Sequence, residues 1–72
     1  KNHIKIAEVL VNLAIVWRKL GKFEHAKNLL KKSLSIYKSH FSNNHVDVAW
    51  TLTHLGALYC EIGDFKEAEK LL

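Results

Sequence analysis

Apolar residues recur along the chain with the spacing of amphipathic helices. They return at intervals of three and four positions, the period at which an α-helix presents one face to a core. The pattern is interrupted at Gly21, again over residues 40–44, and a third time at Gly63. It therefore predicts four helices, over residues 3–20, 23–39, 45–61 and 65–72.

The apolar stripe of each predicted helix indicates which residues form the core. Residues at helical spacing in a folded domain usually face other helices, so we expect all of these residues to be buried. They are Ile6, Leu10, Leu13, Ala14 and Trp17; Phe23, Ala26, Leu30, Leu34 and Tyr37; Val48, Leu52, Leu55, Gly56 and Tyr59; and Phe65, Ala68 and Leu72.

Residues between the stripes predict where the helices end and begin. Gly21 and Gly63 can adopt the positive φ that ends a helix and lets the chain reverse direction. A capping box begins at Asp64. Asn2 or Asn44 is expected to cap the helix that follows it. The predicted helices thus form antiparallel pairs, joined by short turns.

The chain repeats itself at an offset of 42 residues. Ten residues of segment 1–30 are identical to their equivalents in segment 43–72, and several other pairs are conservative. A period of this length indicates a solenoid, in which each unit covers its apolar face with the next unit. The identical pairs are Asn2/Asn44, His3/His45, Ala7/Ala49, Leu10/Leu52, Leu13/Leu55, Gly21/Gly63, Phe23/Phe65, Ala26/Ala68, Leu29/Leu71 and Leu30/Leu72.

The pattern of large and small residues resembles the tetratricopeptide repeat signature. The residues that carry the resemblance are Leu10, Leu13, Ala14, Trp17, Gly21, Phe23, Ala26, Leu30 and Leu34, then Leu52, Leu55, Gly56, Tyr59, Gly63, Phe65, Ala68 and Leu72. The period and the stretch "HVDVAWTLTHLGALY" are similar to the variant found in kinesin light chains, with Ile4 and Val46 where that variant has Pro.

The resemblance implies an all-α fold. The expected architecture is a TPR-like α-α superhelix, or solenoid, built from antiparallel helix hairpins. The chain would form one domain over residues 1–72, holding about 1.7 repeats. Repeat 1 would span residues 3–44, and repeat 2, which is incomplete, residues 45–72.

The resemblance also implies a protein-interaction module without enzyme chemistry. First helices of such repeats line a concave groove that binds a peptide. Asn12 matches the recurrent Asn of that groove, whose amide can both donate to and accept from a peptide backbone, and His54 occupies the equivalent place. Trp50 is either the anchor of a bound peptide or a packing residue against the linker or the neighbouring unit. The matching groove positions are Glu8, Val11, Asn12, Ile15, Lys19, Trp50, Thr53, His54, Ala57 and Glu61.

Composition favours a soluble, folded, helical chain. About half of the residues are apolar, a quarter are charged and none is Pro. The longest apolar run, residues 6–17, is too short for a membrane span and contains Glu8 and Asn12. Cys60 is the only cysteine, which favours a reducing compartment. We therefore expect a cytoplasmic or other intracellular setting and no membrane association.

Histidine and cysteine spacings do not predict a metal or catalytic site. No two of the five histidines have the i, i+4 spacing of a helical zinc motif. Cys60 lies six residues after His54, which places the two side chains on different faces of a helix. We expect no catalytic residues, no metal and no cofactor.

Charge is divided unevenly between the two halves. Residues 1–40 have nine Lys or Arg and two acids, a net charge of +7, whereas residues 41–72 have two Lys and five acids, a net charge of −3. Lys27, Lys31 and Lys38 share one face of the second predicted helix and could contact nucleic acid or another anionic surface. A solvated outer face is the favoured interpretation, because no exposed aromatic residues are interleaved with them. A purely structural spacer in a longer array is the remaining alternative.

Two contacts are also predicted from the repeat. Lys19 and Glu61 are one repeat apart and should approach each other across neighbouring first helices. The last predicted helix has an apolar face made of Phe65, Ala68, Leu71 and Leu72. We expect the chain made alone to dimerise or swap elements through this face, or else to be poorly folded, because an uncovered apolar patch favours association.

Overall fold

The computed structural model describes residues 3–41 and 45–63 and contains three α-helices in that part of the chain. They are α1 (His3–Lys19), α2 (Phe23–His40) and α3 (Val46–Glu61). Each boundary lies within one residue of the boundary predicted from the sequence. The expected helix over residues 65–72 and the capping box at Asp64 lie outside the described residues, as does Asn2.

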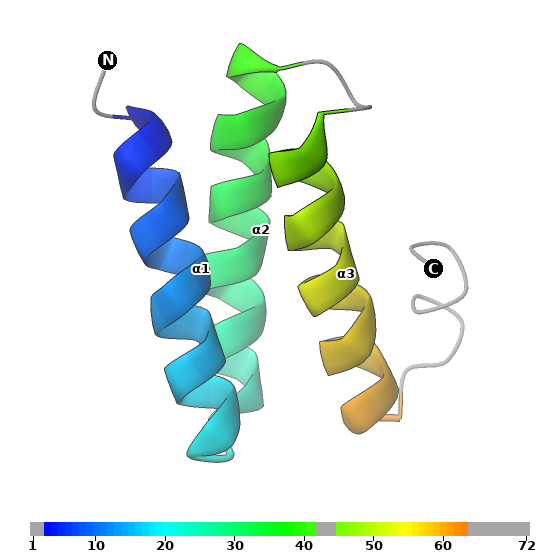
Figure 1. Ribbon diagram of the computed structural model, residues 1–72. Helices are drawn as coiled ribbons and strands as arrows, with labels where there is room; N and C mark the ends of the chain where they lie inside the picture. The colour runs from blue at the N-terminus through cyan, green and yellow to red at the C-terminus, as the bar shows by residue number, and fades with distance from the viewer. Residues whose placement is uncertain (1–2, 42–44, 64–72) are drawn as a thin grey trace.

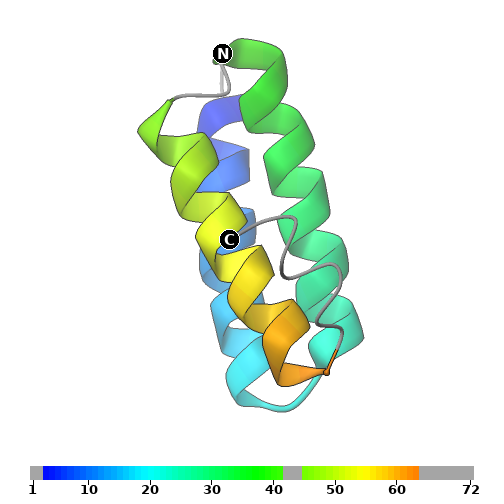
Figure 2. The ribbon, with the colours of Figure 1, turned by 90° about the vertical axis from the view of Figure 1, so that its right-hand side faces the viewer.

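Helix α2 lies between the other two helices and runs antiparallel to both (Figure 1). The view turned by 90° shows the same close packing of the three helices (Figure 2). α1 and α3 therefore run parallel to each other, and each packs mainly against α2. The predicted all-α class and the antiparallel pairing are confirmed.

The turn between α1 and α2 is built around Gly21. This residue has a φ of +81°, a conformation that costs little only for glycine. The amide of Lys22 donates to the carbonyl of Trp17 at 2.9 Å, and the amide of Gly21 donates to the carbonyl of Arg18 at 3.0 Å. These two bonds form a Schellman motif, which satisfies the last carbonyls of α1. Gly63 after α3 has a φ of +85°, so both predicted glycine conformations are confirmed.

The start of α3 is capped by His45, one residue after the predicted Asn44, which lies outside the described residues. The Nδ1 atom of His45 accepts a hydrogen bond from the amide of Asp47 at 3.1 Å. The same imidazole stacks on Phe41, with ring centroids 3.7 Å apart and planes 5° apart. Phe41 directly follows α2, so this stacking fixes the first turn of α3 against the end of α2.

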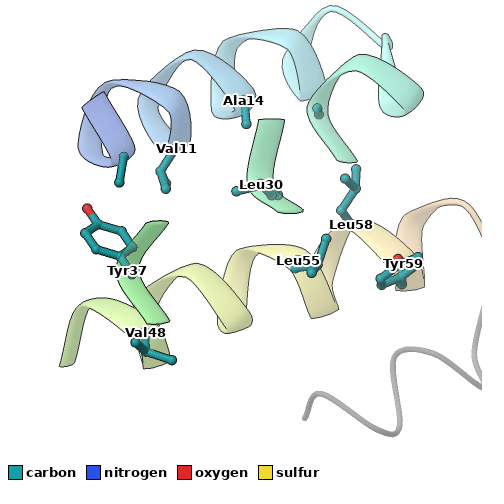
Figure 3. Packing of buried hydrophobic residues seen from close by; sticks show 10 residues of the cluster. Val11, Ala14, Leu30, Tyr37, Val48, Leu55, Leu58 and Tyr59 are labelled. Carbon is teal, nitrogen blue, oxygen red and sulfur yellow. The ribbon is translucent and has the colours of Figure 1, made fainter. Parts of the chain in front are cut away.

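The core runs along both sides of α2 (Figure 3). Ser33 is a fully buried polar residue of α2, and its hydroxyl donates to the carbonyl of Ala7 at 2.8 Å. Tyr37 is almost fully buried; burial raises the pKa of its hydroxyl, and the nearby carboxylates of Asp47 and Glu8 raise it further. The buried apolar residues are Ala7, Val11, Ala14, Ala26, Leu30, Tyr37, Val48, Leu55, Leu58 and Tyr59.

The core of α1 differs from the prediction. Ile6 and Leu13 were expected to be buried, yet 47% and 42% of their surfaces are exposed. The face that α1 presents to α2 is instead formed by the smaller residues Ala7, Val11 and Ala14. A face of small side chains allows the two helix backbones to approach closely, and it leaves the larger apolar residues on the side of α1 that no described helix covers.

Candidate functional site

The predicted groove residues come from α1 and α3, the two parallel helices. Most of them reach the surface, but to different extents. Five are exposed and four are half-buried. The exposed ones are Glu8, Asn12, Lys19, Thr53 and Glu61, and the half-buried ones are Ile15, Trp50, His54 and Ala57.

Val11 is the exception, and its assignment to the groove is wrong. Its side chain has no exposed surface and belongs to the core between α1 and α2. Val11 follows Ala7 by four residues and precedes Ala14 by three, so the three side chains share one face of the helix. Thr53, the equivalent of Val11 in α3, is exposed. A ligand can therefore contact the Thr53 position but not Val11.

An ion pair connects α1 to α3 beside the predicted groove residues. The Nε atom of Arg18 lies 3.2 Å from a carboxylate oxygen of Glu61. The sequence predicted Lys19 as the partner of Glu61, so the predicted residue is displaced by one position. Successive helical residues point about 100° apart, and Arg18 is the one directed towards α3, whereas Lys19 is exposed. The sequence did indicate this contact, because a basic residue in the first repeat lies one repeat before Glu61. Since two basic residues are adjacent there, the sequence did not show which of them pairs with Glu61.

Trp50 and His54 form a second feature of this side of α3. Their rings are one helical turn apart and meet edge to face, with centroids separated by 5.7 Å and planes inclined by 81°. Trp50 packs against the core on one side and keeps part of its surface exposed. Burial lowers the pKa of His54, and the positive charge of Arg18 lowers it further. The lowered pKa favours the neutral imidazole, which can both donate and accept a hydrogen bond.

The part of the chain that the structure describes offers an open surface. No pocket is found among those residues. The same residues contain no cluster of three or more His, Cys, Asp or Glu side chains that could hold a metal ion. None of the three helices is long and apolar enough to cross a membrane. Cys60 is exposed at the end of α3 as a free thiol.

Paired antiparallel helices that repeat along a chain and present an open side define the helical-repeat class of proteins. A model of the tetratricopeptide repeat family matches residues 5–72, and the chain belongs to this family. No curated protein matches the chain. Membership makes the chain a protein-interaction module of a general kind, from a family that is usually non-catalytic.

Proposed function

We propose that the chain binds a peptide segment of a partner protein along the side shared by α1 and α3. The observation that supports this most strongly is the ion pair between Arg18 and Glu61, because it brings the groove-side residues of two equivalent helices next to each other. The surface beside it combines exposed polar side chains with half-buried apolar ones. Short peptides are recognised by this combination, since polar groups bind the backbone and apolar groups bind side chains.

Three residues are proposed to carry the recognition. The exposed carboxamide of Asn12 would donate to and accept from the peptide backbone. Ile15 supplies an aliphatic contact from α1. The exposed part of Trp50 would provide the energetic anchor, because large aromatic residues dominate binding energies at interfaces. The preferred ligand is accordingly an extended or helical segment with aliphatic side chains.

The proposal can be tested with peptides selected from a displayed random-sequence library. The affinity of a selected peptide would be measured by titration calorimetry for the unaltered chain and for Asn12→Ala and Trp50→Ala. We expect each substitution to weaken binding by about 1–3 kcal/mol. Asn12 is exposed, so its replacement should leave helicity, measured by circular dichroism, unchanged.

The matched control is Lys38→Ala, which changes an exposed residue of α2 that is not one of the predicted groove residues. This variant should bind the peptide as tightly as the unaltered chain does. If Asn12→Ala and Trp50→Ala also bind normally, the groove is not the binding surface. If Trp50→Ala unfolds the chain, Trp50 is a packing residue and Asn12→Ala alone decides the question.

Binding to nucleic acid through the basic face of residues 1–40 is the competing proposal. Lys31 and Lys38 of this face are exposed, but Lys27 pairs with Glu24 at 3.1 Å, which reduces the charge it offers to a phosphate. Titration with random-sequence duplex DNA separates the two proposals. Phosphate binding would make the affinity fall steeply with salt, whereas a chain that acts only through the groove should bind such DNA negligibly.

We also propose two finer assignments. The 42-residue repeat supports a relationship to the kinesin-light-chain variant of the family. The exposed thiol of Cys60 supports a reducing, intracellular setting, because such thiols are oxidised readily elsewhere.

A further inference from the structure

Two acidic residues, Glu8 of α1 and Asp47 of α3, have no Lys or Arg partner among the residues that the structure describes. The other two acids in that part of the chain, Glu24 and Glu61, each pair with a basic side chain. Both unpaired acids reach the surface, since Glu8 is exposed and 37% of the side-chain surface of Asp47 is accessible. In a chain with a net charge of +4, two such carboxylates are suited to a cation from another molecule.

The two acids flank the hydroxyl of Tyr37 in α2. Tyr37 is only 1% exposed, and its hydroxyl points towards the first turns of α1 (Figure 3). Burial raises the pKa of this hydroxyl, and the negative charges of Asp47 and Glu8 raise it further, so both carboxylates lie close to it. Three helices thus bring one oxygen-bearing side chain each to the same place.

Packing at the junction of α2 and α3 holds Asp47 near Tyr37. Tyr37 stacks on Phe41 with ring centroids 6.1 Å apart, and Phe41 stacks on His45 with centroids 3.7 Å apart. The Nδ1 atom of His45 accepts the amide of Asp47 at 3.1 Å and lies 3.7 Å from a carboxylate oxygen of the same residue. The first turn of α3 is therefore fixed beside the tyrosine ring.

A buried hydrogen bond holds α1 beside the same tyrosine. The hydroxyl of Ser33, one turn before Tyr37, donates to the carbonyl of Ala7 at 2.8 Å. Glu8 directly follows Ala7, so the backbone that carries its side chain is fixed against α2. The site is thus built on three packed helices and not on a loop.

The Tyr37 hydroxyl has unused hydrogen-bonding capacity. It makes no hydrogen bond to any residue that the structure describes. In the same part of the chain, no buried side-chain nitrogen or oxygen atom lacks a partner, so the oxygen of this hydroxyl reaches the surface. A tyrosine hydroxyl can donate to a carboxylate and accept from a ligand at the same time.

The three side chains suit the ammonium group of a lysine. This group is a compact charge with three N–H donors, and the site offers the oxygens of two carboxylates and one hydroxyl. A calcium ion, by contrast, takes about six to eight oxygen ligands. Two carboxylates held near each other also repel, and a bound cation relieves that repulsion.

We propose that Glu8, Tyr37 and Asp47 form a binding site for a lysine side chain of the partner peptide. The proposal rests on peptide binding at the side shared by α1 and α3, and it adds the place of a basic residue in the ligand. Asn12 lies one helical turn after Glu8, a rise of about 5.4 Å. An extended peptide advances about 3.3–3.6 Å per residue, so the lysine should lie about two residues from the peptide group that Asn12 binds.

Selection of peptides from a displayed random-sequence library tests the site. The unaltered chain should enrich lysine at one position. A variant that combines Glu8→Gln with Asp47→Asn should lose that enrichment and still enrich the aliphatic residues. The matched control is Glu24→Gln, which removes an exposed acid of α2 outside the predicted groove, and it should enrich lysine as the unaltered chain does. Circular dichroism would show that each variant is folded.

One selected peptide, compared with a copy that has norleucine in place of its lysine, identifies the residues that bind the ammonium group. Norleucine keeps the aliphatic stem and lacks the charge. For the unaltered chain, calorimetry should show that this replacement weakens binding about three- to tenfold. The loss should be smaller for Glu8→Gln, for Asp47→Asn and for Tyr37→Phe, which keeps the buried ring and removes only the hydroxyl.

Three results would overturn the proposal, and they can be told apart. Lysine enrichment by the double variant, or an equal loss from norleucine in every variant, would remove this site and leave peptide binding intact. If no peptide is selected at all, the site and peptide binding both fall. A titration with calcium chloride alone should give no binding heat, and heat that disappears in Glu8→Gln would show a metal site instead.

Discussion

Helices α1 and α3 are equivalent in sequence but are packed differently. Two rows of equivalent positions, on different sides of each helix, can be compared. In α1 the first row, Ala7, Val11 and Ala14, is buried against α2. In α3 the second row, which includes Val48, Leu55 and Leu58, is buried against the same helix. Position relative to α2, and not residue type, therefore decides which row forms the core.

The largest difference between the two helices should appear when equivalent apolar residues are truncated. Leu58 is fully buried and Val16, its equivalent in α1, is 52% exposed. We expect Leu58→Ala to lower the free energy of unfolding by about 2–5 kcal/mol, and Val16→Ala by about 0.5 kcal/mol or less. Urea denaturation at low protein concentration would measure both. Similar losses would mean that α1 and α3 are not packed differently.

A smaller effect is expected for the ion pair that joins the two helices. Arg18 and Glu61 are both partly exposed, with 27% and 45% of their side-chain surfaces accessible. A double-mutant cycle with Arg18→Ala and Glu61→Ala should give a coupling free energy of at most about 1 kcal/mol, as surface ion pairs do. The same cycle with Lys19→Ala provides the control and should give a coupling near zero. A coupling free energy that is larger for Lys19 than for Arg18 would show that Lys19 is the partner of Glu61, as the sequence predicted.

The smallest expected effect is the pH dependence of stability that comes from His54, which occupies in α3 the place of Asn12 in α1. The pKa of His54 is lowered on folding, so the unfolded chain binds a proton more readily than the folded chain. The contribution of the neutral His54 to the free energy of unfolding is therefore fully present above the unfolded pKa of about 6.5. It is lost as the pH falls through the lower pKa of the folded state. His54→Gln has no imidazole to titrate, so its free energy of unfolding should fall less than that of the unaltered chain as the pH is lowered. The urea midpoints of both chains from pH 7.5 to pH 5 would reveal it, and identical pH profiles would contradict the assignment.

Most of the fold could be predicted from the sequence because its signals are local. Helical periodicity located α1, α2 and α3, and the glycine positions located the turns. The repeat identified the family. Burial could not be predicted as well, since α1 has two apolar rows and spacing alone does not indicate which of them a neighbouring helix covers. Ile6 and Leu13 were assigned to the core for that reason.

The candidate site was predicted less completely. Val11 was assigned to the groove although it is buried in the core. Neighbouring residues of a helix point in directions about 100° apart, so a small rotation of the helix about its axis decides whether a side chain faces the groove or the core. The same effect explains why Glu61 pairs with Arg18 and not with Lys19, because the two adjacent side chains point in different directions. The capping role of His45 depends on its imidazole lying over Phe41, a contact between the end of one helix and the start of the next. Such rotations and contacts follow from tertiary packing and not from spacing alone.

The most direct test is the rate at which a thiol placed on each row reacts with a labelling reagent. In a Cys60→Ser background, single cysteines would be introduced as Val16→Cys, Leu58→Cys and Val46→Cys, and labelling would be followed by mass spectrometry. In dilute solution we expect rapid labelling at positions 16 and 46 and slow labelling at position 58. Equal labelling rates at positions 16 and 58 would contradict the account.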